Sequence, residues 1–371
     1  MKKIITIIVA VLMVFTLAAC GGGTTDPEPA PAPAPAPAPE TPAAETPAEE
    51  TPASNLPYNL DNVGDQKFIL AHGMPETGMT AIQYHEFAVA VAELSEGKMI
   101  VEERIGGTLL TDTETLDGVM NGTADFVHSM GSYVTGTVTD LSPLTIAGYY
   151  GGDDWQGFIN DTRSLVTDIY GEYGIRYMAA LNQGHSVIAC TEMQIKTPAD
   201  VKGLAFRASG TWVSKTVEAW GGAATTIGLA DLADSFNKGV VQGVATGLNI
   251  IVPFKIFESA KYITKSTMSE GFAALLMNGE RWDSLNADEQ ALLNEAALIF
   301  EAKSVELANG FMESYMAEIE DSGRNEIYFL TAAEQQQFVE LAYGLYPQME
   351  PELGAKGIEL IGLLKKANGI G

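Results

Sequence analysis

The sequence predicts an α/β protein with two lobes, parallel-rich sheets, a cleft between the lobes and a long C-terminal helical region. From residue 65 onward, short apolar stretches alternate with stretches of helical periodicity, the order that parallel sheets covered by helices produce. The chain has 371 residues, whereas single hydrophobic cores seldom exceed about 250–300 residues. Residues 281–323 keep a helical pattern without proline, which predicts an extended helical region.

Residues 1–19 are expected to be a signal peptide and not part of the fold. Lys2 and Lys3 precede an uncharged apolar run of residues 4–19, which is typical of a secretory signal and slightly short for a transmembrane helix. The run ends in "LAAC" followed by "GGG", which resembles a bacterial lipobox. We therefore expect cleavage before Cys20 and lipidation of Cys20, which anchors a protein without spanning the membrane. The alternative is an ordinary signal cleaved nearby.

Residues 20–57 are expected to form a tether between the lipid and the globular part. Their Pro/Ala/Glu repeat favours an extended, polyproline-like chain with no core. Acidic residues without Lys or Arg add self-repulsion to the segment. The solute-binding part is then expected over residues 58–371.

The first lobe is expected to span mainly residues 65–185. Its first helix carries Ile82, Phe87 and Val91 at helical spacing, and Gly97 ends it. The order of elements is β-α-β-α-β, typical of a sheet covered by helices. The expected strands are residues 67–73, 98–105, 125–130 and 175–181, and the expected helices are residues 80–97, 111–124 and 154–174.

The second lobe is expected to span mainly residues 186–275. Thr197, Pro198 and Asp200 form a good helical start, with a hydroxyl cap, proline at the first position and an acid at the third. The expected strands are residues 185–190, 203–208, 223–228, 240–247 and 271–278, and the expected helices are residues 211–222 and 229–239. Residues 276–371 are expected to add helices that pack on both lobes, at 281–323, 330–349 and 351–369.

Composition and motifs argue against several classes of function. The net charge of −27 disfavours nucleic acid as a partner, because phosphates demand a basic surface. If Cys20 carries lipid, Cys190 has no partner and no disulfide can form within the chain. The four histidines lack metal-ligand spacing, and the sequence contains no Walker loop, GxSxG or GxGxxG motif. We therefore expect no cofactor, no metal and no catalytic residue.

Arg207 is the best-placed candidate for ligand chemistry. It ends an apolar strand and directly precedes a helix, and ligands of open parallel sheets bind outside the carboxyl ends of the strands. The free N–H groups at a helix start also attract anions. A guanidinium can grip a carboxylate with two parallel N–H bonds. Spacing alone leaves two interpretations open, a carboxylate-binding corner or an ion pair with a nearby Asp or Glu.

Several segments, taken in order, resemble the TRAP transporter solute-binding proteins of the DctP type. "DVKGLAFR" and, after a helix, "FNKGVVQG" resemble the "DLKGLKIR" strand and "GVVDG" element of that family. "GGTLLTDTETLDGVMNGTADF", "FESAKYIT" and "RWDSLNADEQALLNEAA" resemble further segments, so that the likeness covers about residues 66–350. It implies a periplasmic-binding-protein-like fold whose two lobes close over a solute.

The resemblance also implies which residues contact the solute. Arg207 matches the family arginine that pairs with a carboxylate, and Thr246 lies near the polar position after "VDG". The other candidates are Asn249 three residues further on, His72 and Met130 at strand ends, the nearby Tyr133, and Asp112 in the matched front loop. Many members have a second arginine about twenty residues before the first. Here "NQGHSVI" occupies that stretch, so His185 or Asn182 would have to replace it.

Each candidate other than Arg207 also fits a structural role. His72 and His185 could be structural residues whose ring nitrogens are hydrogen-bonded within the protein, and Met130 could be part of an apolar wall. Asp112 fits a helix cap. Trp212, in the first turn after Arg207, fits either a ring stacked on a ligand or packing between the lobes.

The expected function is an extracytoplasmic solute receptor of a TRAP transporter, held on the cell surface or in the periplasm through Cys20. It would bind a small organic acid between its lobes and deliver it to membrane permease subunits, without a reaction. A single clear cation favours a monocarboxylate. The alternatives are a solute-binding lipoprotein that serves another importer or a sensor, an extracellular enzyme, and an adhesive lipoprotein.

Overall fold

The computed structural model describes residues 56–150, 154–269 and 271–370. The expected signal peptide, Cys20 and nearly all of the expected tether lie outside these residues. Within the described part, no helix is both long enough and apolar enough to cross a bilayer. The described residues form one compact unit, and it contains two sheets.

The first sheet has five strands in the order β2-β1-β3-β10-β4. β1 pairs in parallel with β2 and β3, while β10 runs antiparallel to both β3 and β4. The strands are β1 (Gln66–Ala71), β2 (Met99–Arg104), β3 (Phe126–Met130), β4 (Ile175–Leu181) and β10 (Ala273–Asn278). All six residues of β10 are buried, because its apolar run is covered on both faces of the sheet.

The second sheet has six strands in the order β11-β9-β5-β8-β6-β7. β6 pairs in parallel with β7 and β8, and β9 pairs in parallel with β11, whereas β5 runs antiparallel to both β8 and β9. The strands are β5 (His185–Cys190), β6 (Ala205–Ala208), β7 (Ala223–Thr226), β8 (Gly243–Gly247), β9 (Tyr262–Ser269) and β11 (Glu326–Phe329).

The expected two-lobed α/β class is confirmed, and its sheets are mixed. Both antiparallel insertions occur where the chain changes lobe, because β5 directly follows β4 and β10 directly follows β9. Antiparallel neighbours do not need the crossover helix that parallel neighbours require, so both strands can join their sheets directly from the other lobe. The sequence pattern shows the βαβ units but not these two crossings.

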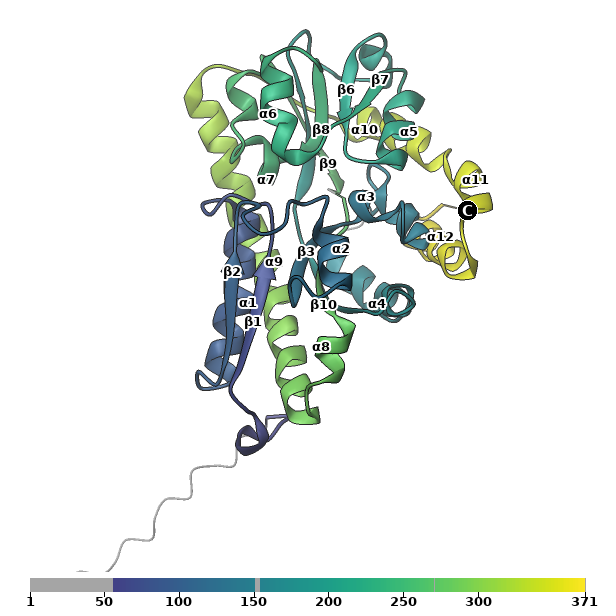
Figure 1. Cartoon of the computed structure of the whole chain (residues 1–371). Helices are drawn as coiled ribbons and strands as arrows, with labels where there is room; N and C mark the ends of the chain where they lie inside the picture. The colour runs from purple at the N-terminus through teal and green to yellow at the C-terminus, as the bar shows by residue number, and fades with distance from the viewer. Residues whose placement is uncertain (1–55, 151–153, 270, 371) are drawn as a thin grey trace, which may run out of the picture. The chain divides into compact units, whose positions relative to one another are not determined.

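Helices cover the sheets, and one of them reaches both lobes. The 36-residue helix α9 (Ala287–Ser322) is about 54 Å long at 1.5 Å per residue. Asn286 and Glu289 form a capping box at its start, and Gly323 ends it at φ +61°. α9 packs on α1 and β4 of the first lobe and on α7 of the second (Figure 1).

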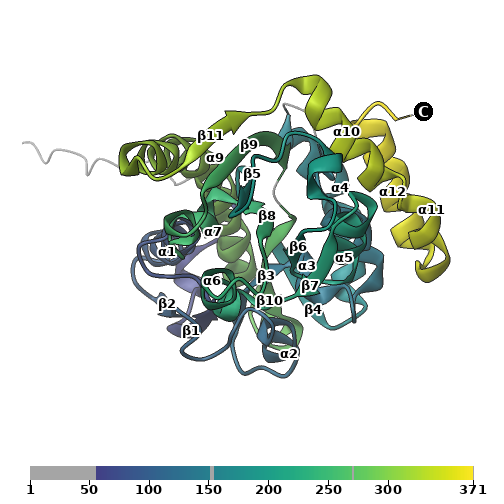
Figure 2. The same cartoon turned by 90° about the horizontal axis from the view of Figure 1, so that it is seen from above.

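The remaining helices are short or of moderate length. α10 packs on α5 and α12 packs on α4, so these C-terminal helices gather on one side of the molecule in Figure 2. The helices besides α9 are α1 (Met79–Leu94), α2 (Thr115–Met120), α3 (Gly131–Val134), α4 (Trp155–Gly171), α5 (Thr211–Ala219), α6 (Leu229–Asn237), α7 (Leu248–Ile251), α8 (Gly279–Asp283), α10 (Ala332–Tyr343), α11 (Tyr346–Met349) and α12 (Ala355–Ala367). Short 3-10 turns are η1 (Leu60–Asn62), η2 (Thr139–Thr145), η3 (Pro198–Val201), η4 (Ile256–Glu258) and η5 (Glu350–Glu352).

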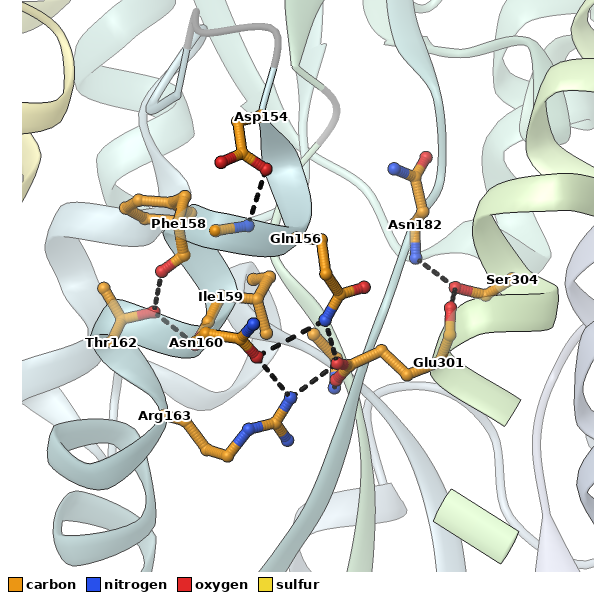
Figure 3. A network of polar contacts seen from close by, with 12 residues as sticks. Asp154, Gln156, Phe158, Ile159, Asn160, Thr162, Arg163, Asn182, Glu301 and Ser304 are labelled. Carbon is orange, nitrogen blue, oxygen red and sulfur yellow. Dashed lines mark hydrogen bonds and ion pairs between the residues drawn. The ribbon is translucent and has the colours of Figure 1, made fainter. Parts of the chain in front are cut away.

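A buried polar network fixes α4 and β4 to α9 near the β4–β5 crossing (Figure 3). The Glu301 carboxylate, 1% exposed, pairs with Arg163 through its Oε1. The same oxygen accepts from Gln156 Nε2 at 2.6 Å, and Oε2 accepts from the Ala180 backbone N–H at 2.9 Å. One turn later, Ser304 Oγ accepts from the Asn182 backbone N–H at 3.1 Å. The crossing is therefore held to the long helix.

Candidate functional site

A pocket lies between the two lobes, with walls from both sheets. The space open to the centre of a water molecule is about 80 Å³, where one water needs about 10–15 Å³, so a small solute fits. Its polar lining is His128, Ser132, Tyr133, Thr145, Gln183, Ser186, Arg207, Ser209, Thr216 and Thr246. Its apolar lining includes Met74, Met130, Ile146, Val213, Val217, Trp220, Leu229, Ile250 and Met268.

Arg207 supplies the positive charge of the pocket. It lies on β6 with only 6% of its surface exposed. Its Nε donates to the Ile227 carbonyl at 2.9 Å, and one NH2 group donates to the Tyr133 hydroxyl at 2.8 Å. Among the described residues, no carboxylate lies within 4.0 Å of the guanidinium. A guanidinium has five N–H donors. Three of those of Arg207 have no partner among the described residues and remain available to a ligand.

The two lobes touch beside Arg207. Tyr133 lies on α3 of the first lobe, so its hydrogen bond with Arg207 crosses between the lobes. Gly210, which precedes α5 of the second lobe, faces the same turn: a Cβ added to it would lie 2.1 Å from the Ser132 carbonyl oxygen. Only glycine allows this approach, which brings the start of α5 against α3 beside the pocket.

Asp112 and His72 are buried next to this corner but do not line the pocket. Burial raises the pKa of Asp112 to about 6, and the nearby Arg207 charge works in the opposite direction. The Asp112 carboxylate lies so close to Gly73 that a Cβ there would be 2.1 Å from its Oδ2. His72 stacks on Tyr84 with ring centroids 5.5 Å apart, and burial lowers its pKa to about 4.

His128 lines the pocket although sequence reasoning did not select it. Its Nδ1 lies 2.8 Å from the Tyr84 hydroxyl. Burial lowers the pKa of His128 to about 3, so the ring is neutral at physiological pH. One signal was present: His128 lies two residues before the candidate Met130 on the same strand, and alternate residues share a face.

Four of the sequence candidates come together in the pocket lining, namely Arg207, Thr246, Met130 and Tyr133. The others lie outside it. Trp212 is 3% exposed within the apolar cluster of the first lobe, and Lys215 Nζ lies 3.8 Å from its ring centroid. Asn249 is buried and bonded to Gln183.

In the stretch "NQGHSVI", His185 or Asn182 was expected to replace the second arginine of the family. The residue between these two that lines the pocket is instead Gln183, while Asn182 and His185 do not line it. Asn182 Oδ1 is used in the turn, where it accepts from the Gly184 backbone N–H at 2.9 Å. His185 is exposed, because Ser186 beside it on β5 faces the pocket and neighbouring strand residues point to opposite faces.

This architecture is that of a two-lobed solute receptor with a pocket between its lobes. Residues 70–352 match the DctP family model, described as bacterial extracellular solute-binding protein, family 7. The chain therefore belongs to this family of TRAP solute-binding proteins, as the ordered motifs predicted.

Relatives and solved structures agree with this assignment. The C4-dicarboxylate-binding protein DctB of Bacillus subtilis is 23% identical over 80% of this chain and 86% of its own length. The Bordetella pertussis receptor DctP7, solved with pyroglutamic acid, has a TM-score of 0.74 at 16% identity over 81% of this chain and 99% of that one. The ectoine-binding protein of Halomonas elongata has a TM-score of 0.76 at 18% identity, over 82% and 99% of the two chains.

Proposed function

We propose that this protein is the receptor of a TRAP transporter for a small organic acid, which Arg207 binds by its carboxylate. The observation that carries the proposal is a buried arginine with unused donors in an interlobe pocket. Among the described residues no carboxylate pairs directly with this cation, and a buried cation without a direct partner is costly, so a ligand carboxylate would supply that partner. Binding, lobe closure and delivery to permease subunits constitute the function, without a chemical step.

The ligands of similar proteins support an acid as the solute. A Rhodobacter capsulatus relative is named as a C4-dicarboxylate-binding protein. Receptors of the same fold were solved with succinate, β-D-galacturonate and orotic acid. These ligands all carry a carboxylate, the group that a guanidinium fork matches.

A ligand screen tests the proposal. The full-length protein in detergent is titrated with small mono- and dicarboxylic acids, neutral sugars and amino acids, and the melting temperature is followed. A ligand at a concentration of 100 times its Kd stabilises the folded protein by about 2.7 kcal/mol. A carboxylate hit supports the proposal, while stabilisation by neutral solutes alone contradicts it. Genes for a multi-span permease beside this one would favour a TRAP transporter over another importer or a sensor.

The affinity for a carboxylate is expected to rise as the pH falls from 7.5 to 5.5. Asp112, whose pKa burial raises to about 6, is charged at the upper pH and repels an anion, and it loses most of this charge at the lower pH. The change in Kd is expected to be about three- to tenfold, from about 1 kcal/mol between partly screened charges. Calorimetry at both pH values, in buffers of different ionisation enthalpy, measures the affinity and the accompanying proton uptake.

Two variants control this experiment. Asp112→Asn should bind at pH 7.5 as tightly as the wild type does at pH 5.5, with no proton uptake. Asp117→Asn, on the exposed surface of α2, should retain the full pH dependence. An Asp112→Asn protein with unchanged pH dependence would show that another group titrates.

Gly210→Ala is expected to weaken ligand binding by about 10- to 100-fold, since overpacking costs about 1–3 kcal/mol. The added Cβ would lie 2.1 Å from the Ser132 carbonyl oxygen, so α5 and α3 would have to separate beside Arg207. Calorimetry measures the affinity, and small-angle scattering measures how far the lobes open. Gly228→Ala is the matched control, because Gly228 precedes α6 in the same way but has open space around its Cβ position. Equal affinities of the two variants would contradict the close-contact role.

We also propose that lipid on Cys20 holds the receptor on the outer side of a membrane. The support is the "LAAC" segment after an apolar run and the extracellular description of the family. Cys20→Ser should release the protein into the soluble extracytoplasmic fraction and abolish its labelling by a fatty-acid analogue. Continued labelling of that variant would refute the assignment.

A further inference from the structure

Gln183 presents a buried, unpartnered hydrogen-bond donor at the pocket. Its side chain is 4% exposed and lines the pocket. Its Oε1 accepts from Asn249 Nδ2 at 2.9 Å. Its Nε2 has no partner among the described residues. A buried donor left unpaired costs about 1–3 kcal/mol, so a ligand acceptor is the natural partner.

The fold holds this side chain in place from both directions. Gly184, at φ +77°, has its Cβ position 2.6 Å from Met312 Sδ on α9, so the turn after Gln183 fits tightly against the long helix. On the other side, Asn249 Nδ2 also lies 3.4 Å from Thr80 Oγ1 of α1. The carboxamide is therefore preorganised and does not depend on the ligand for its position.

Gln183 and Arg207 reach the pocket from separated strands. β8 lies between β5, which Gln183 precedes, and β6, which carries Arg207. The register places Ala189 of β5, and not Gln183, opposite Arg207 across β8, so Gln183 lies further along, before β5 begins. Both side chains nevertheless line the same pocket, so one small solute can meet both with two different groups.

The surroundings of Gln183 favour a neutral group. Arg207 is the only Lys or Arg among the described residues that line the pocket. His128 contributes a neutral ring, since burial lowers its pKa to about 3. A second ligand carboxylate would thus be buried without a cation, which costs several kcal/mol, whereas a carbonyl, amide or hydroxyl oxygen would satisfy Gln183 Nε2.

We infer that Gln183 forms a second subsite and that the solute is a monocarboxylate with a neutral hydrogen-bonding group at its other end. This inference rests on the proposed carboxylate role of Arg207. It separates this chain from the relatives named for C4-dicarboxylates, although the fold is shared.

Three acids with the same four-carbon skeleton test the inference. Butyrate, succinamate and succinate differ only at the end away from the first carboxylate, which is a methyl, a neutral amide or a second carboxylate. Calorimetry with the full-length protein in detergent is expected to show succinamate binding about tenfold or more tighter than either other acid, because butyrate offers no acceptor to the Gln183 amide and succinate would bury a second charge without a cation.

Variants assign the preference to Gln183. In Gln183→Leu, succinamate and butyrate should bind alike. In Gln183→Lys, the added cation should make succinate the best of the three. The control Gln337→Leu, on the exposed face of α10, should keep the wild-type order. Urea unfolding of each variant verifies that it is folded at the temperature used.

The outcomes separate the two proposals. If the acids bind and lose affinity in Arg207→Ala, but succinamate shows no advantage or Gln183→Leu keeps it, the subsite is overturned while the receptor function remains. If none of the three acids binds, the inference fails, and if Arg207→Ala binds them like the wild type, the carboxylate role fails as well.

Discussion

Arg207→Ala is expected to weaken binding of a carboxylate ligand by about 100- to 1,000-fold, because removing one partner of a buried charge pair costs about 2–5 kcal/mol. Arg207 is buried and lines the pocket, and only two of its donors have partners among the described residues. Arg207→Lys keeps the charge but loses the two-point grip, so an intermediate loss is expected. Calorimetry with the best ligand of the screen measures both variants.

Arg207→Ala also removes two hydrogen bonds within the protein, to Ile227 and Tyr133. A matched control is therefore Arg281→Ala, which removes a half-buried arginine over Phe68, away from the pocket. Arg281→Ala should lose stability without losing affinity. Equal affinity of Arg207→Ala and wild type would rule out Arg207 as the carboxylate partner.

Arg163→Met is expected to lower the free energy of unfolding by about 3 kcal/mol, because it leaves the Glu301 carboxylate buried without its cation. Glu301 is 1% exposed, while the Arg163 side chain is 28% exposed, so the cost falls at the lower end of the range for buried pairs. Urea unfolding at pH 7 with an unchanged m-value measures this loss.

A second substitution isolates the charge. In the double variant Arg163→Met/Glu301→Gln, the neutral amide can still accept from the Ala180 backbone N–H, and most of the stability should return. Lys238→Met, which removes an exposed ion pair with Asp234, should cost less than about 1 kcal/mol. Surface substitutions typically change the free energy of unfolding by less than about 0.5 kcal/mol. If Arg163→Met alone stays within that range of the wild type, Glu301 does not need this partner.

Local pattern was enough to find nine of the eleven strands that the described residues form, and the position of Arg207, but it did not predict β9 or β11. The fully apolar run of β10 and the helical spacing of α1 are visible in the letters alone. Arg207 was found because it ends a strand just before a helix, a relation between neighbours in sequence. The ordered motifs then indicated the family, which the match over residues 70–352 confirms.

Contacts between distant segments account for what sequence reasoning missed. Gln183 lines the pocket because Gly184 packs on Met312 of α9 and Asn249 holds its amide. Met312 lies 128 residues from Gly184, and Asn249 lies 66 residues from Gln183. Trp212 follows Arg207 closely in sequence, yet it is buried in the apolar cluster around the first sheet. No periodicity within a short window encodes either outcome.

By itself, the sequence determined the two-lobed α/β class, the family and the placement of a cation at a strand end, because each depends on local patterns of apolar, polar and turn residues. Only the tertiary structure decided the antiparallel entry of β5 and β10, the contact of Gly210 with Ser132, and the neutral groups that share the pocket with Arg207. Those features arise from strand order and from packing across the two lobes, where residues far apart in sequence meet.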